Sequence, residues 1–272
     1  MGPLSDSVRG IMAGIDIWEI GVIPYLLNNS GVWGDIPKKA MEMLDSLQNT
    51  FYRYILGAPR STPTPALLWE TGGLSMACRI NIRKLTFYHH VMSLDGRAIA
   101  SRVANLAARA GFPGLIREYK ELCAKYNLPC ARTVSKQVWK KLVKRAVTDA
   151  NRINLLEQIQ SRYKKLDHNI LVNEQYETKQ YFKTLRLSNA RLKFRIRTKM
   201  VEKIAFNYSS DAKYVNRLWQ CTHCECIDSQ AHVLTCVGYQ HLREGKNLAS
   251  DSDLVSYFRD VISLRDKLED II

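Results

Sequence analysis

The stretch from residue 219 to residue 239 reads WQCTHCECIDSQAHVLTCVGY and holds a compact set of metal-binding side chains. Its candidate ligands, spaced C-x2-C-x7-H-x3-C, are Cys221, Cys224, His232 and Cys236. A gap of two residues lets both thiolates of a tight turn point at one ion, and a gap of three places an imidazole and a thiolate on one side of a helical turn. Three sulfurs and one nitrogen suit a closed tetrahedral site, so the sequence predicts zinc in a structural role.

Other side chains in or just after this stretch leave alternatives open. His223, Cys226 and His241 are substitute ligands, and the four residues could also be a buried group without an ion. The spacing between the two halves is shorter than in fingers that read a DNA groove, so the pattern predicts a small knuckle instead. Asp228 and Ser229 precede the expected helical turn and can cap it.

The composition is that of a soluble globular protein, with 46% hydrophobic and 24% charged residues in 272. The longest uncharged run, Ile20–Gly34, has 15 residues and is too short and too polar for a membrane span. The N-terminus lacks the basic and apolar regions of a secretory signal. Seven unevenly spread cysteines argue against a disulfide framework. We therefore expect a nuclear or cytoplasmic protein without a membrane partner.

Basic residues are concentrated in one segment. Between Arg132 and Lys203 the chain has 19 Lys and Arg residues against 6 Asp and Glu residues, which gives +13 of the net charge of +14. Beside a zinc knuckle, such a segment indicates nucleic-acid binding, although a solvated helical face would have the same composition. The candidate phosphate contacts are Arg186, Arg191, Lys193, Arg195, Arg197, Lys199 and Lys203. Trp219 and Tyr239 flank the knuckle and either stack on exposed bases or pack against the metal core.

Apolar residues recur at helical spacing along most of the chain, and no Gly or Pro occurs between residues 130 and 237. The positions expected to face a core are Ala40, Leu44, Leu47, Phe51 and Ile55, then Val138, Leu142, Val147, Leu155 and Ile159, then Leu192, Ile196, Met200 and Ile204, and finally Leu254, Phe258, Val261, Leu264 and Leu268. The basic side chains between Arg191 and Lys199 would then stay outside. Residues 11–34 mix two periods and leave helix and strand undecided.

Several of these segments resemble the C-terminal part of non-LTR retrotransposon reverse transcriptases, after the polymerase palm. The run IPYLL at residues 23–27, followed by Trp33, is similar to the segment just past the palm, and LQNTFYRYILGAP at residues 47–59 is similar to the thumb helix. ETGGL at residues 70–74 resembles the family's Glu-x-Gly turn, and the C-x2-C-x7-H-x3-C pattern resembles its zinc knuckle. The resemblance covers roughly residues 11–260. It implies an α-helical thumb and linker that grip template RNA and target DNA.

The chain departs from that family in its catalytic residues. A polymerase needs paired aspartates to hold two metal ions, and no Asp-Asp pair occurs here. Asp251 and Asp253 are close together but are expected to start a helix, because no further acidic motif completes a nuclease site. Gly72-Gly73 is a turn and not a phosphate-binding loop. We therefore expect no enzymatic activity.

The sequence predicts a mostly α protein, a thumb-like helical bundle with long basic helices and a small CCHC zinc knuckle. The expected domains are a thumb-like domain at residues 1–130, a basic helical linker at 131–210, the knuckle at 211–241 and a C-terminal helix at 242–272. The expected function is that of a nucleic-acid-binding reverse transcriptase fragment without its palm, with RNA or DNA as partner. The alternative is a zinc-stabilised protein-interaction module domesticated from a retroelement.

Overall fold

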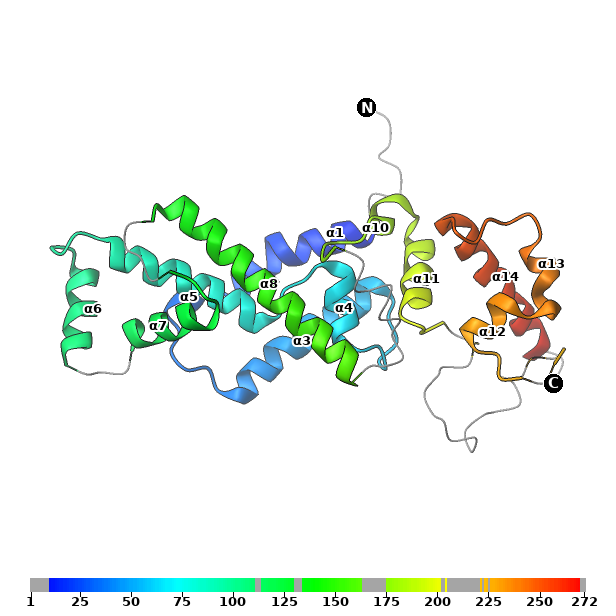
Figure 1. Cartoon of the computed structure of the whole chain (residues 1–272), viewed down its shortest axis with the longest axis horizontal. Helices are drawn as coiled ribbons and strands as arrows, with labels where there is room; N and C mark the ends of the chain where they lie inside the picture. Colours follow the sequence, from blue (N-terminus) through cyan, green and yellow to red (C-terminus); the bar gives the residue numbers. More distant parts are fainter. Residues whose placement is uncertain are drawn as a thin grey trace, which may run out of the picture. The chain divides into compact units, whose positions relative to one another are not determined.

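The computed structural model describes residues 10–110, 114–129, 134–162, 175–201, 204, 221, 223–224 and 226–269. This part of the chain is mostly helical and has no β-strand, as predicted (Figure 1). It forms two compact units, and neither unit is a continuous stretch of sequence. Unit 1 combines residues up to Asp16 with Tyr52–Thr71 and the chain from Ile159 onward, and unit 2 combines Ile17–Phe51 with Gly72–Gln158.

Unit 2 is built around two long helices, α5 and α8. Its elements are η1 (Ile17–Val22), α2 (Ile23–Leu26), η2 (Ser30–Val32), most of α3 (Lys38–Leu56), α5 (Met76–Ser93), α6 (Ile99–Arg109), α7 (Leu115–Lys125) and most of α8 (Lys136–Arg162). Ser75 caps α5, because its hydroxyl accepts a hydrogen bond from the Cys78 N–H at 3.4 Å. α5 therefore begins at the residue after this cap.

The centre of unit 2 is Trp139 of α8, which is fully buried. Its indole N–H donates to the Leu85 carbonyl at 3.1 Å, and its ring stacks on His89 with centroids 4.7 Å apart. Val143 and Val147 continue the same side of α8 at a spacing of four residues and are also buried. Unit 2 extends to Gln158 and therefore includes most of α8.

Unit 1 collects elements from three regions of the sequence. They are α1 (Ile11–Asp16), the end of α3, α4 (Thr64–Thr71), α10 (Tyr181–Thr184), α11 (Leu187–Arg197), α12 (Gln230–Thr235), η5 (Val237–Tyr239), α13 (Gln240–Arg243) and α14 (Asp251–Glu269). One of its buried clusters joins Val255, Phe258 and Val261 of α14 to Val233 of α12. The predicted C-terminal helix is therefore present, with an apolar side packed against α12.

Two predictions about helical faces are wrong in detail. In α3, the predicted core residue Leu47 is exposed and the next residue, Gln48, is buried. In α8, the predicted core residues Val138 and Leu142 are exposed, and the residues that follow them, Trp139 and Val143, are buried. In α8, the large indole of Trp139 takes the buried position that was predicted for Val138. Residues 11–34, left undecided, form helical segments that include the π-helical turn η1, where buried Trp18 stacks on Phe51 at 4.7 Å.

The predicted apolar stripe from Leu192 to Ile204 is not one helix. α11 ends at Arg197, and Lys199 adopts a left-handed backbone conformation with φ of 55°. Met200 and Ile204 are buried beyond the helix end. None of the described helices combines the length and the apolar character that crossing a membrane requires.

Candidate metal centre and basic surfaces

Two short elements of unit 1 position the predicted ligands. The Cys221 N–H donates to the Cys226 carbonyl at 2.8 Å, which closes the turn that carries Cys221 and Cys224. The Ser229 hydroxyl accepts from the His232 N–H at 3.1 Å and caps α12, as predicted. α12 carries His232, and Cys236 follows its last residue.

The four predicted ligands come together in space, and we call them the Cys/His cluster: Cys221, Cys224, His232 and Cys236. Their donor atoms all lie within 4.8 Å of one another. The Cys221 and Cys236 sulfurs are 3.6 Å apart. The Cys224 sulfur is 3.9 Å from the Cys236 sulfur and 3.4 Å from His232 Nε2.

These distances suit a tetrahedral ion. With metal–sulfur bonds of about 2.3 Å and a metal–nitrogen bond of about 2.0 Å, the edges of a tetrahedron are about 3.8 Å between sulfurs and about 3.5 Å between sulfur and nitrogen. Three of the six separations, at 3.4–3.9 Å, match those edges, and the other three are no longer than 4.8 Å. The cluster can therefore hold a metal ion.

Thiol ionisation in the cluster is uneven. Burial raises the pKa of Cys221, but hydrogen bonds from His232, from the His223 and Cys224 backbone and from Cys236 together lower it to about 6. Burial raises the pKa of Cys236, and the neighbouring thiols of Cys221 and Cys224 raise it further. The Cys221 thiol therefore ionises readily, and its negative charge opposes ionisation of the neighbouring thiols. A divalent cation bound among them would neutralise this charge.

A buried carboxylate, that of Asp228, lies next to the cluster. The Asp228 carboxylate is fully buried, pairs with the Arg265 guanidinium and accepts a hydrogen bond from the Tyr239 hydroxyl. Its Oδ1 atom has no hydrogen-bond partner among the described residues and lies 3.9 Å from His232 Nε2. A cation held by His232 would compensate this carboxylate charge. Asp228 therefore lies beside the cluster, and Ser229 is the residue that caps α12.

The substitute ligands remain outside the cluster. Cys226 is exposed and contributes its backbone carbonyl, as described above. The exposed His223 ring packs against Gly238, where an added Cβ would lie 2.1 Å from His223 Cδ2. His241 is exposed on α13. Among the described residues, the donor atoms that gather are those of the four predicted ligands.

The basic side chains of α11 do not all face solvent, contrary to the prediction. Arg191 Nε donates to the Ile55 carbonyl and Arg195 Nε to the Gly57 carbonyl, both at 2.9 Å, which satisfies carbonyls at the end of α3. Such carbonyls lack partners inside their own helix and attract cationic donors. Lys193 forms an ion pair with Asp251 at 2.7 Å, and its side chain is 12% exposed.

Arg197 is the most strongly engaged residue of α11. Its Nε lies 2.9 Å and its Nη2 also 2.9 Å from oxygens of Glu70, a residue of α4 that is 1% exposed. Glu70 also accepts a hydrogen bond from the Tyr181 hydroxyl at 2.8 Å. α11 was predicted as a helix with an apolar inner side, but acidic and carbonyl partners far away in sequence draw its basic side chains inward.

The other candidate contacts divide into three groups. Arg186 is exposed just before α11, and Lys199 is half-buried after it. Tyr239 is buried and donates its hydroxyl to Asp228, so it packs beside the Cys/His cluster and its ring is covered and cannot stack on bases. Burial raises its pKa, and the nearby thiols raise it further. Lys203 and Trp219 lie outside the described residues.

An exposed basic surface lies on α8, and its residues are not among the phosphate contacts predicted from the sequence. We call it the α8 basic surface: Lys136, Lys140, Lys141, Lys144 and Arg145. All five side chains are exposed, whereas Trp139 and Val143 of the same turns are buried. The signal was available in the sequence, because the basic residues repeat at i, i+4 and avoid the positions of Trp139 and Val143.

Comparisons with protein-family models, with curated proteins and with solved structures give no match. The resemblance to reverse transcriptases therefore remains a prediction from the residues quoted above.

Proposed function

We propose that this chain binds nucleic acid through the α8 basic surface and that a zinc ion in the Cys/His cluster stabilises unit 1. The observation that supports nucleic-acid binding most is the arrangement of exposed charge on α8. Lys140 and Lys144 form one i, i+4 pair of like charges, and Lys141 and Arg145 form another. Each such pair destabilises a helix by about 0.2–0.5 kcal/mol, so a bound polyanion would relieve the repulsion.

Little in the described structure compensates this charge. Arg145 lies 3.9 Å from Asp149, an exposed pair of small energetic value. Lys140, Lys141 and Lys144 have no acidic partner among the described residues. The buried side chains of Trp139 and Val143 hold the helix in place regardless of charge. Phosphates of RNA or DNA are the polyanion that fits a row of exposed lysines.

The test is a salt titration of binding to a labelled RNA hairpin and to a DNA duplex. The logarithm of affinity should fall with the logarithm of salt concentration, with a slope of roughly −0.7 to −0.9 per phosphate contact. The triple variant Lys140→Gln, Lys141→Gln, Lys144→Gln should reduce the slope by up to about three contacts, for all sequences alike.

A matched control separates local contacts from net charge. Lys38, Lys39 and Lys120 are also exposed, and changing all three to Gln removes the same charge from the same unit. This control should retain most of the wild-type slope. Equal slopes for wild type and the α8 variant would refute the α8 interface.

Zinc is proposed for the cluster because three thiolates and one imidazole form a closed set of soft ligands. Protein purified under reducing conditions should contain about one equivalent of zinc by elemental analysis. With all four positions supplied by the protein, the ion would be structural and would leave no site for a reacting water.

The resemblance to reverse transcriptases extends the proposal. The chain would be a C-terminal region that holds RNA or DNA for a polymerase palm and carries no catalytic carboxylates itself. It should not extend a primer on RNA or DNA with Mg²⁺ and nucleotides. Extension that is lost on mutating a residue of this chain would overturn this part of the proposal.

The second candidate function is a protein-interaction module. Large exposed apolar side chains in unit 2, on α3 and α6, favour it. If neither nucleic acid binds at low salt, this function becomes the better one.

A further inference from the structure

α6 is packed on unit 2 with its small residues inward and its large apolar residues outward. Its buried side chains are Ser101 and Ala104. Ile99 is 78%, Val103 58% and Leu106 60% exposed. These three residues lie at i, i+4 and i+7 and so share one side of the helix, which we call the α6 stripe. Such a side is normally the one that a helix buries.

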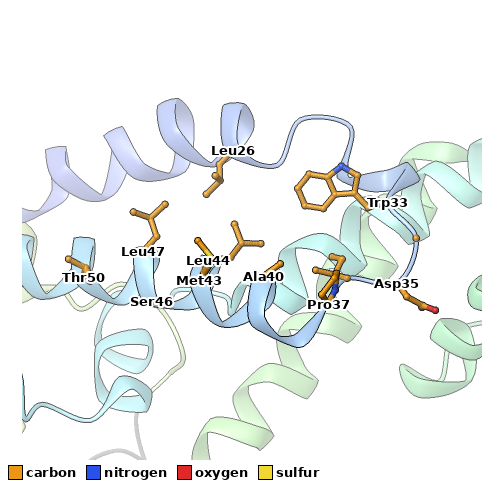
Figure 2. A pocket seen from close by; sticks show the side chains of 12 residues that line it. Leu26, Trp33, Asp35, Pro37, Ala40, Met43, Leu44, Ser46, Leu47 and Thr50 are labelled. Atoms are coloured by element: carbon orange, nitrogen blue, oxygen red, sulfur yellow. The ribbon is translucent and has the colours of Figure 1, made fainter.

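The same unit has an open apolar groove between α2 and α3, which we call the α3 groove (Figure 2). Its volume is about 910 Å³. The apolar side chains that line it include Leu26, Trp33, Ala40, Met43, Leu44 and Leu47. In Figure 2, Leu26 faces α3 from the opposite wall and Trp33 closes one end. Met43 is 66% and Leu47 47% exposed, so solvent covers surface that a partner would bury.

The stripe does not fill the groove of its own chain. α6 packs against α5 and α7. Within unit 2, α6 lies at one end and α3 lies away from it (Figure 1). A second copy of the chain, however, brings both features together without any change in the unit.

Size and charge match between the two surfaces. α6 from Ile99 to Arg109 has 11 residues and is about 16 Å long, which equals the length of α3 from Ala40 to Thr50 along the groove. The segment 97–110 has three arginines and no acidic residue. Asp35 lines the end of the groove, and exposed Glu42, which precedes the lining residue Met43, forms an exposed ion pair with Lys38 at 3.8 Å. In a second copy, arginines that flank the stripe would lie close to these carboxylates.

We propose that two copies of the chain form a dimer in which the α6 stripe of each copy inserts into the α3 groove of the other. Each copy has one stripe and one groove, so a reciprocal exchange satisfies both and closes with two-fold symmetry. The mode is an amphipathic helix in an apolar groove. The proposal is independent of nucleic-acid binding, because none of the α8 basic surface residues takes part.

The experiment measures the mass of the purified full chain in solution by light scattering and sedimentation, over a range of concentrations. Wild type should have twice the mass of one chain. The stripe variant carries Val103→Glu and Leu106→Glu, and the groove variant carries Met43→Glu and Leu47→Glu. Each variant should be monomeric, with a dimer dissociation constant at least 100-fold higher than that of wild type. All four positions are exposed. Circular dichroism should therefore show unchanged helix content.

Mixing the two variants gives the decisive result. The stripe variant retains a normal groove and the groove variant a normal stripe, so an equimolar mixture should form a heterodimer with one intact contact. An interface that pairs stripe with stripe or groove with groove would not recover on mixing. The control Ile153→Glu changes an exposed apolar residue of α8, 51% exposed and outside both surfaces, and should remain dimeric.

Two results would overturn the proposal. The first is a wild-type chain that stays monomeric at every concentration, which would leave the groove to a different partner. The second is a dimer that either resists both variants or fails to re-form in the mixture. Recovery in the mixture, together with a dimeric Ile153→Glu control, supports it.

Discussion

Replacing Arg197 with Gln should destabilise unit 1 strongly. The guanidinium of Arg197 is 12% exposed and contacts both oxygens of Glu70, whose side chain is 1% exposed, at 2.9–3.0 Å. After the substitution, Glu70 would retain the Tyr181 hydroxyl at 2.8 Å but lose its counter-charge. The Glu70 carboxylate would then be buried without a cation.

The magnitude follows from two independent estimates. Unit charges about 4 Å apart interact by about 4 kcal/mol at an effective dielectric constant of 20. Breaking a buried ion pair by removing one partner costs about 3–5 kcal/mol in measured cases. We therefore expect a loss of about 3–5 kcal/mol. With an m-value of about 2 kcal/mol per molar urea, this moves the unfolding midpoint by about 2 M.

The assay is urea unfolding of the full chain, followed by circular dichroism. The double variant Glu70→Gln, Arg197→Gln removes both charges, so its cost should be clearly less than the sum of the two single costs. Arg186→Gln is the matched control, because Arg186 is exposed just before α11, and it should change stability by less than about 0.5 kcal/mol. A loss below about 1 kcal/mol for Arg197→Gln would refute the assignment of Arg197 to the fold.

Three further predictions concern the cluster and the core. Cys221→Ser and His232→Ala should each lose the bound zinc measured by elemental analysis, whereas Cys226→Ser, which changes an exposed neighbour outside the cluster, should retain it. Gly238→Ala should weaken zinc affinity, measured by chelator competition, at least about tenfold. The reason is that the new Cβ would lie 2.7 Å from His223 Cβ and would displace the turn that carries Cys221. Adding His223→Gly to this variant should restore the affinity. Burial lowers the pKa of His89 below its ordinary 6.5, so the unfolded chain binds a proton there at higher pH than the folded chain. The stability that neutral His89 contributes is therefore complete above about pH 6.5 and falls as the pH drops. The difference between the melting temperatures at pH 7.5 and pH 5.5 should be smaller in His89→Gln than in wild type. In the control His90→Gln, which changes an exposed histidine, this difference should equal that of wild type. An equal pH dependence in wild type and His89→Gln would contradict this.

The helical class and the ligand set could be predicted from sequence because both are local. A helix requires periodic apolar residues and an absence of Gly and Pro, and those signals lie within a few turns. The Cys/His cluster spans only residues 221–236, and the turn and the capped helix that carry its donor atoms lie within that span. The Ser229 cap is equally local and was predicted correctly.

The roles of the basic residues could not be predicted, because they depend on partners far away in sequence. Both α8 and α11 are basic in composition, but Glu70 and the carbonyls of Ile55 and Gly57 pair with arginines of α11, across more than 120 residues of sequence. The exposed lysines of α8 have no such partner among the described residues. Tyr239 is a second case, since only the fold brings Asp228 and Arg265 to its hydroxyl. Periodicity shows which side of a helix is apolar, but tertiary packing decides whether that side is covered and which charged side chains are paired. For this reason the exposure of the α6 stripe to solvent could be seen only in the structure.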